Sequence, residues 1–421
     1  MKFGLICPPG TGHLNNFAAI GYELRQRGHQ VTLFGLPDVK SYALAADLDF
    51  YPLGVGEYPP GSVARSQQRL GELNGIPALL YTIDLFRQGT KTVLKDVPPA
   101  IKQAEVEFLL IDQVLLEGST IAEYTSLPYI TVCSALLLNS EPSVPPTLLG
   151  WNYDPSWLGQ LRNQLGTSFL KVAGLPVQLI VNEYRQKWGL AAISSKEPQD
   201  IWSKRAIISQ QPPSFEFPRQ ELPDYFHFVG PLVNNSARAE IPFPWDKLTD
   251  KPLIYASLGT IQNQILWVFI QIAYACLGMD VQLVISLGGA SEPEALGYVP
   301  GTPIVVKAAP QLALLERASL CITHAGLNTT LESLSNGVPM VAIPITNDQP
   351  AVAARIAYTK TGEVVPLNSC NVDSLKAAIT KVLTQPEYRQ NAQKLQAEIE
   401  RAGGVKTAAD IIEAEISANK N

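Results

Sequence analysis

The sequence has few of the features that mark an exported, disulfide-bonded protein. Its 421 residues include five cysteines, an odd number scattered mostly through apolar runs, where a cysteine behaves as a small hydrophobic residue. Only Phe3 to Cys7 precede Pro8, and this apolar run is too short for a signal peptide. We therefore expect a cytoplasmic protein in a reducing compartment, without a disulfide framework.

Long hydrophobic runs are also scarce. The most apolar longer stretch, Ile265 to Met279, is interrupted by Gln271 and falls short of the roughly 20 residues that cross a bilayer. With 32 Lys and Arg against 38 Asp and Glu, the net charge of -6 argues against nucleic acid or an acidic membrane as the main partner. We expect a monomer without a transmembrane segment, and a transient contact with a membrane surface stays open.

Motifs for other common ligands are missing as well. No Gly-x-Gly-x-x-Gly follows the first predicted strand and no Walker lysine follows Gly10-Thr11-Gly12, which disfavours dinucleotide and ATP binding. No cluster of metal ligands is evident, and the one Asp-x-Asp, at Asp47-Leu48-Asp49, lies apart from the other functional motifs. We expect that the function needs no metal ion.

Length and composition favour two α/β domains, because 421 residues with 46% hydrophobic content exceed the size of one compact core. In the first half, the pattern predicts a strand at Lys2 to Cys7, a helix from Leu14 that ends at Gly28, and a strand at Val31 to Phe34. This βαβ unit implies a parallel sheet whose ligand side lies at the carboxyl ends of its strands.

The second half repeats this pattern, with a strand at Leu253 to Ser257, a helix from about Asn263 to Gly278 and a strand at Val281 to Ser286. Prolines crowd the region from Pro212 to Pro244 between the halves. The predicted organisation is a first domain over 1–225, a linker over 226–250, a second domain over 251–403 and a terminal helix over 404–421.

The segment from Thr323 to Leu334 carries the strongest functional signal. A buried strand is predicted to end just before His324, and a helix to begin near Asn328. The unpaired backbone N–H groups at such a helix start form a site for a phosphate or diphosphate. Glu332 lies one turn further on, where its carboxylate suits the two hydroxyls of a ribose. The segment therefore predicts a nucleotide diphosphate site.

Several motifs, in this order, resemble the donor-sugar box of bacterial UDP-glycosyltransferases: Ala308-Ala309-Pro310-Gln311, His324 to Ser333, Gly337-Val338-Pro339 and Asp348-Gln349. The resemblance extends over the whole chain. It implies an α/β protein with two Rossmann-like domains facing across a cleft, the GT-B fold, and a terminal helix that packs back toward the first domain. A UDP-sugar is then a co-substrate, and no cofactor is implied. The plant box starts with a tryptophan that stacks on uracil, but this chain has Ala308, so the base is less well defined.

By this resemblance His324 contacts the diphosphate, Asn328 and Thr329 the phosphates, Glu332 the ribose, and Asp348 with Gln349 the sugar hydroxyls. The turn after the strand ending at Ser257 also offers glycine and hydroxyl groups to a phosphate. The predicted donor-binding residues are Ser257, Gly259, Thr260, Ala309, Gln311, His324, Gly326, Asn328, Thr329, Glu332, Asp348 and Gln349.

Sugar transfer to an alcohol needs a base near the acceptor hydroxyl. His13 stands in a turn at the ligand edge of the first predicted sheet, just ahead of a helix start, which is expected to lower its pKa and keep it neutral. The resemblance also assigns the base to this histidine. Asp112 ends another strand on the same side, so we expect it to orient His13. Capping a helix is the structural alternative for both residues. In-line displacement would invert the anomeric carbon.

Aromatic residues between Leu136 and Trp202 are candidates for the wall of an apolar acceptor pocket, and Trp151, Tyr153 and Trp157 are the predicted contacts. The alternative is that these aromatics are simply core. The first 34 residues are most similar to the carotenoid and macrolide branch of the family. The expected reaction is transfer of a hexose, glucose by preference, to a lipophilic carotenoid, terpenoid or phenolic alcohol.

Other functions remain open at this point. A sugar-nucleotide epimerase or hydrolase, and a non-catalytic sugar-nucleotide binder, would share the donor site, although the presence of His13 weakens the second of these. A nicotinamide-dependent oxidoreductase is disfavoured by the missing dinucleotide motif.

Overall fold

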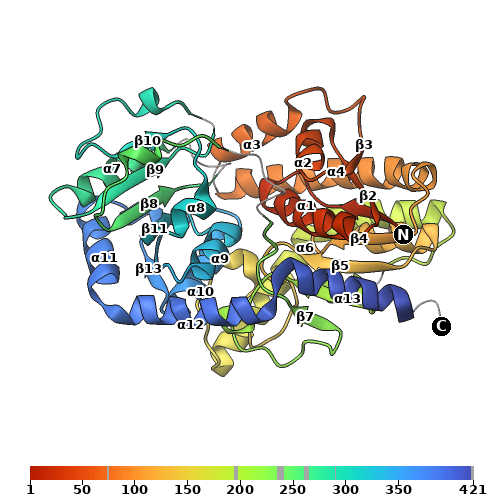
Figure 1. Ribbon diagram of the computed structural model, residues 1–421. Helices are drawn as coiled ribbons and strands as arrows, with labels where there is room; N and C mark the ends of the chain where they lie inside the picture. Colours follow the sequence, from red (N-terminus) through yellow and green to blue (C-terminus); the bar gives the residue numbers. More distant parts are fainter. Residues whose placement is uncertain (74, 194–197, 235–240, 260–264, 290, 419–421) are drawn as a thin grey trace.

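The computed structural model describes residues 1–73, 75–193, 198–234, 241–259, 265–289 and 291–418. Two α/β lobes lie side by side, each built on its own parallel sheet (Figure 1). The predicted architecture is confirmed, and the terminal helix crosses from the second lobe to the first.

The first sheet has seven parallel strands in the order β3-β2-β1-β4-β5-β6-β7. Apolar residues dominate the central strands, as expected when helices cover both faces. Its strands are β1 (Lys2–Ile6), β2 (Gln30–Gly35), β3 (Asp49–Pro52), β4 (Phe108–Asp112), β5 (Tyr129–Cys133), β6 (Ile207–Ser209) and β7 (Phe226–Phe228).

The second sheet has six parallel strands in the order β10-β9-β8-β11-β12-β13. The strands are β8 (Leu253–Ser257), β9 (Gln282–Ser286), β10 (Ile304–Val306), β11 (Ala318–Thr323), β12 (Met340–Ala342) and β13 (Gly362–Val364). The strand predicted before His324 is therefore present as β11.

The helices of the first lobe are α1 (Thr11–Gln26), α2 (Lys40–Ala45), α3 (Ser62–Glu72), α4 (Gly75–Gln103), α5 (Gly118–Thr125) and α6 (Trp157–Lys187). Those that follow are α7 (Leu266–Cys276), α8 (Gln311–Leu315), α9 (Leu327–Ser335), α10 (Gln349–Tyr358), α11 (Val372–Thr384), α12 (Pro386–Ala402) and α13 (Gly404–Ala418). Within the described ranges, α6 is the one helix whose length and composition would fit a membrane span. The sequence contains no uninterrupted apolar run at α6 because polar residues recur along this helix.

The terminal helix packs on the first domain, as predicted. Val405, Ala408 and Ile412 of α13 share a hydrophobic core with α1 (Figure 1). Arg27, just after α1, donates hydrogen bonds to carboxylates of α13, and His29 pairs with Glu413 at 3.0 Å. His29 is therefore a structural residue.

The boundary predicted between the first domain and the linker needs a correction. The range 226–250 begins with β7, which pairs in parallel with β6 and completes the first sheet. Three residues with two aromatic side chains gave too short a pattern to be recognised as a strand. His227 therefore lies in the sheet and not in a linker.

Each sheet reverses its strand order at one point, between β1 and β4 in the first and between β8 and β11 in the second. A crevice forms outside the carboxyl ends of the strands at such a switch point, and ligands of α/β proteins bind there. His13 follows β1, Asp112 ends β4, Ser257 ends β8 and His324 follows β11. The fold thus brings the residues selected from the sequence to both switch points.

Candidate active site

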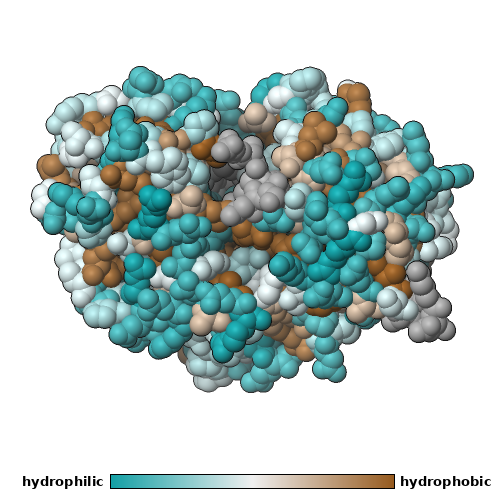
Figure 2. All heavy atoms as spheres, in the orientation of Figure 1, coloured by the Kyte–Doolittle hydropathy of each residue, from teal (hydrophilic) through white to brown (hydrophobic). Residues whose placement is uncertain are grey.

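A large cavity of about 1460 Å³ lies between the domains and is lined by residues of both. Figure 2 shows the surface hollowed between the two lobes, with hydrophobic residues beside the hollow. His13 lines this cavity, and so do all predicted donor-binding residues except Thr260, which lies outside the described residues. The cavity therefore unites the predicted base with the predicted donor site.

His13 and Asp112 form a hydrogen-bonded pair at the first switch point. The Nδ1 of His13 lies 2.7 Å from Oδ2 of Asp112, whose side chain is fully buried, while Oδ1 accepts from the backbone N–H of Val114. Because a carboxylate only accepts, the proton of a neutral imidazole sits on Nδ1 and the Nε2 lone pair is left to accept another. The arrangement matches the predicted pairing of the two residues.

The pKa of His13 is shifted in the direction opposite to our sequence-based expectation. Burial lowers the pKa, but the charge of Asp112, its hydrogen bond and the charge of Asp348 outweigh burial and raise the pKa above its ordinary value. The expectation of a lowered pKa considered only the helix start: Asp112 was predicted as a partner without its effect on the pKa, and Asp348 comes from the other domain. The neutral base is therefore favoured on the alkaline side of a raised pKa.

His324 is held in a narrow space between two glycines. A Cβ atom on either Gly259 or Gly326 would lie 2.5 Å from its Nε2, so neither position accepts a side chain without displacing the ring. Burial lowers the pKa of His324 to about 4, which keeps the imidazole neutral, and its Nδ1 has no hydrogen-bond partner among the described residues. Gly259, from the turn after β8, and Gly326, from the predicted box, thus both fix the position of this ring.

The N-terminus of α9 opens into the cavity beside His324. Gly326 is its N-cap in extended conformation, and no side chain of the described residues caps the helix. Its first-turn N–H groups and the positive end of the helix dipole therefore face the cavity, which is the geometry that the predicted anion site requires.

A hydrogen-bonded network fixes Glu332 one turn further along α9. Gln311 donates from Nε2 to Oε2 of Glu332 at 2.6 Å and to the hydroxyl of Thr329 at 3.2 Å, while its Oε1 accepts from the hydroxyl of Tyr255. Glu332 is buried at the cavity wall. Its carboxylate is thus oriented before any ligand binds, which suits an acceptor for vicinal hydroxyls.

Asn328 makes contacts that the sequence did not predict. Its Nδ2 donates to the carbonyl oxygen of Gly12 at 3.1 Å, and its Oδ1 accepts from Gln210 at 3.0 Å. Gln210 also donates to the Ser134 carbonyl oxygen. The Asn328 side chain, expected at the phosphates, is therefore engaged with the first domain next to His13, and only its backbone lies in the helix start. Gln210 was not among the predicted site residues because a single glutamine after a three-residue strand belongs to no recognisable motif.

Asp348 and Gln349 lie on the second-domain side of the cavity, at the start of α10. Gln349 accepts hydrogen bonds from the backbone N–H groups of Ile345 and Thr346, which fixes the turn before the helix. Burial raises the pKa of Asp348, and the nearby His13 opposes that shift. His13 and Asp348, from different domains, thus line the same cavity.

The three aromatic residues predicted to contact the acceptor lie elsewhere. Trp151, Tyr153 and Trp157 do not line the cavity. Tyr153 stacks on Phe217 and meets Tyr358 of α10, so it belongs to the contact between the domains. Trp157 is exposed at the start of α6. The sequence showed that aromatics were concentrated in this region but not which of them the chain would turn inward.

The first-domain side of the cavity, where the acceptor was predicted to bind, is lined instead by residues from α3, α4, α6 and the loops after β4 and β5. These include Leu70, Phe86, Leu115, Leu138, Val172 and Val181. Aliphatic residues on amphipathic helices are indistinguishable from core residues by their spacing, which is why this wall was not identified from the sequence.

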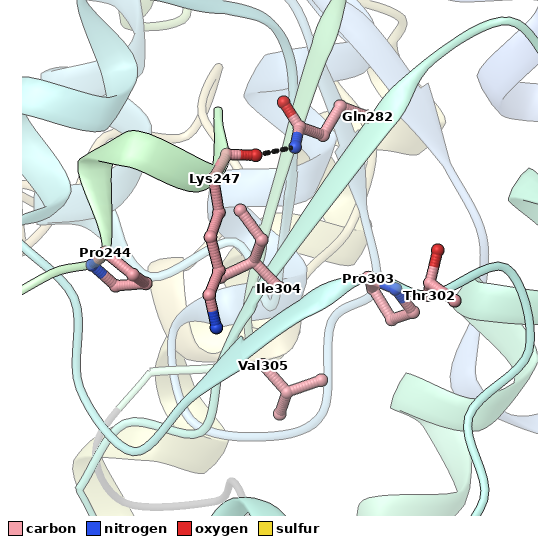
Figure 3. Close-up of a pocket in the computed structure, with 7 residues that line it drawn as sticks. All are labelled: Pro244, Lys247, Gln282, Thr302, Pro303, Ile304 and Val305. Atoms are coloured by element: carbon pink, nitrogen blue, oxygen red, sulfur yellow. Dashed lines mark hydrogen bonds between the residues drawn. The ribbon is translucent and has the colours of Figure 1, made fainter. Parts of the chain in front are cut away.

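Figure 3 shows a second hollow, near the amino ends of β9 and β10. Gln282 donates there to the Lys247 carbonyl oxygen at 2.7 Å, and none of the predicted site residues lines it. Ligands bind at the opposite edge of parallel sheets, so this hollow is not part of the site. Within the described ranges, no three or more His, Cys, Asp or Glu side chains are placed to hold a metal ion.

Two Rossmann-like domains that share one cavity at their opposed switch points are the architecture of GT-B glycosyltransferases, and the chain has this architecture. The family is more closely defined by comparison with known proteins. Residues 65–402 match the family described as UDP-glucoronosyl and UDP-glucosyl transferase. The chain belongs to this family, as the donor box predicted, and is a glycosyltransferase acting on small molecules.

Among curated proteins, the chain is similar to the zeaxanthin glucosyltransferases of Pantoea ananas and Pseudescherichia vulneris. The first is 32% identical over 98% of this chain and 95% of the relative, and the second is 31% identical over 100% and 99%. Among solved structures, the glycotransferase of kitacinnamycin superposes with a TM-score of 0.77 at 21% identity, covering 98% of each chain. The fold is thus shared along the whole chain.

Proposed function

We propose that the protein is an inverting glycosyltransferase that moves glucose from UDP-glucose to a hydroxyl of a lipophilic alcohol, with a carotenoid as the favoured acceptor. The observation that carries this proposal is the position of the His13–Asp112 pair and the α9 N-terminus in the wall of one cavity. The names of the two curated relatives support both glucose and a carotenoid alcohol.

In the proposed reaction, Nε2 of His13 takes the proton of the acceptor hydroxyl as its oxygen attacks the anomeric carbon. The bond from that carbon to the diphosphate oxygen breaks, and its electron pair leaves with UDP. Asp112 holds the ring in the tautomer that can accept a proton and stabilises the imidazolium that forms. Attack opposite the leaving group converts an α-linked donor into a β-linked product.

The leaving diphosphate gains negative charge in this step. The first-turn N–H groups of α9 are fixed in place before reaction and need no reorientation as the charge develops. We therefore propose that the helix start meets this requirement and that no metal ion takes part. Glu332 would accept hydrogen bonds from the ribose hydroxyls.

The free cysteines are consistent with function in the reducing cytoplasm. All five are unpaired, and burial raises the pKa of the Cys133 thiol well above its ordinary value, which makes that thiol inert.

The test is incubation with UDP-glucose or dTDP-glucose and a panel of lipophilic alcohols, with products identified by mass and the anomeric linkage by NMR. We expect a β-glucoside with UDP-glucose. His13→Ala should abolish transfer and leave UDP binding unchanged, whereas His227→Ala, on β7, should retain transfer. Free glucose formed without any glucoside would identify a hydrolase, and transfer at the wild-type rate by His13→Ala would exclude the base assignment.

A further inference from the structure

A long apolar stripe runs along the solvent side of α6. Its side chains recur every three or four residues over about six turns, a length of roughly 33 Å, so they share one face. Their exposed fractions range from 47% for Leu161 to 72% for Trp157. The members of this α6 stripe are Trp157, Leu158, Leu161, Leu165, Phe169, Val172, Leu175 and Leu179. A monomeric protein rarely exposes so many large apolar side chains in one continuous area.

The opposite face of α6 is fixed in the first domain. Ile180 and Val181 belong to a hydrophobic core together with residues of α4. Arg185 is buried and donates to Thr120 and Glu123 of α5. Because these contacts hold the helix, it cannot rotate to hide the stripe or leave the domain to span a bilayer.

The α6 stripe continues into the acceptor side of the cavity. Val172 and Leu175 belong to the stripe and also line the cavity. Phe86 of α4 and Leu148 likewise line the cavity while exposing apolar surface. Apolar surface therefore leads from the outer face of α6 into the cavity that His13 also lines.

The charge around the stripe differs in sign from that of the whole chain. Residues 62–95 and 157–187, which include α3, most of α4 and all of α6, hold nine basic and three acidic residues, although the net charge of the chain is -6. Of the basic residues beside the stripe, Arg162 donates to the Asn152 carbonyl oxygen and lies over the Trp151 ring, and Lys171 lines the cavity. Basic residues beside an apolar helix face are the pattern that binds the surface of an anionic bilayer.

We propose that the α6 stripe docks on the surface of an anionic lipid bilayer and that a lipophilic acceptor enters the cavity directly from the bilayer. The second part rests on the proposed function, since only a lipophilic acceptor resides in a bilayer. The helix lies in the interface with its apolar face among the headgroups, and the excess of basic residues in α3, α4 and α6 favours anionic lipid. A water-soluble acceptor would need no such surface.

The test is flotation of the protein with vesicles of phosphatidylcholine alone or with phosphatidylglycerol, in the absence of donor and acceptor. The stripe variant carries Leu161→Gln, Leu165→Gln and Phe169→Gln, three positions that do not line the cavity. The matched control carries Trp267→Gln, Tyr274→Gln and Leu277→Gln on α7, where the side chains are similarly exposed.

We expect the wild type and the α7 control to float with anionic vesicles, with a vesicle-bound fraction at least about tenfold higher than that of the stripe variant. The stripe variant should keep its thermal unfolding midpoint and its rate with a detergent-dispersed acceptor, and lose rate with the same acceptor in vesicles.

Failure of the wild type to bind any vesicle would overturn the docking proposal and leave the proposed function intact. Docking without transfer to any lipophilic alcohol would overturn the proposed function alone. A concentration-dependent dimer that the stripe variant cannot form, without vesicle binding, would assign the stripe to a second copy of the chain.

Discussion

Replacement of Asp112 by Asn tests the catalytic pair most sharply. The change removes the negative charge 2.7 Å from Nδ1 of His13 but keeps the size of the side chain. At an effective dielectric constant near 20, a unit charge at roughly 4 Å contributes on the order of 4 kcal/mol, and water at the ring, whose side chain is 23% exposed, reduces this effect. Because that charge raises the pKa of His13, we expect the pKa to fall when Asp112 becomes Asn.

The same substitution also affects the tautomer. An asparagine amide can donate to Nδ1, which moves the ring proton to Nε2 and removes the lone pair needed by the acceptor. We expect kcat to fall by about 10²- to 10⁴-fold, with UDP affinity unchanged, because Asp112 does not line the cavity.

The assay is the pH dependence of kcat for the wild type, Asp112→Asn and a control, Asp96→Asn. Asp96 is a partly buried carboxylate that accepts from the backbone N–H of Gly54, away from His13. The wild-type rate should rise with pH through an inflection above the ordinary histidine pKa of about 6.5, because the base must be neutral. The inflection should move to lower pH only in Asp112→Asn. An unmoved inflection with kcat within about threefold of the wild type would refute the pairing.

Three further predictions concern binding and stability. Glu332→Gln should weaken UDP binding about 10- to 100-fold, as measured by calorimetry, because a charged acceptor for the ribose hydroxyls is lost. An unchanged Kd for UDP would contradict that role. Gly326→Ala should weaken UDP binding at least about tenfold, because the new Cβ displaces His324. Gly56→Ala, where a Cβ meets nothing within 4 Å, should leave UDP binding unchanged. Equal affinities of the two variants for UDP would show that the position of the His324 ring is unimportant. Burial raises the pKa of Glu117 to about 7 from 4.5, so its ionisation costs stability as pH rises through this window. Glu117→Gln should therefore be more stable than the wild type by up to about 3 kcal/mol at pH 8 and equally stable near pH 4, and a gain independent of pH would be inconsistent with titration of this carboxyl.

Much of the fold could be predicted because its signals are local. The β1–α1–β2 unit and the β11–α9 turn combine short apolar strands, glycine turns and helical spacing, and each appears where the pattern indicated. The donor box was recognisable because it consists of a few polar residues at fixed intervals on one helix and its flanking turns. The Asp112 partner of His13 could be inferred because both residues follow central strands at one edge of a parallel sheet.

Features that depend on distant contacts were not predictable in the same way. The engagement of Asn328 with Gly12 and Gln210 exists only because the domains meet, and no spacing in the sequence encodes it. The charge of Asp112 is the main cause that raises the pKa of His13, and Asp348 of the second domain adds to it. The acceptor wall was assigned to Tyr153 and its neighbours because aromatic content is visible in a sequence, but the direction in which a loop turns its side chains is not.

A crystal structure with bound UDP tests the central claim most directly. The expected result is a diphosphate against the first-turn N–H groups of α9, beside His324, with the ribose hydroxyls on the carboxylate of Glu332 and the β-phosphate open to the side of His13. A nucleotide bound away from both His324 and Glu332 would contradict the proposed donor site and the mechanism built on it.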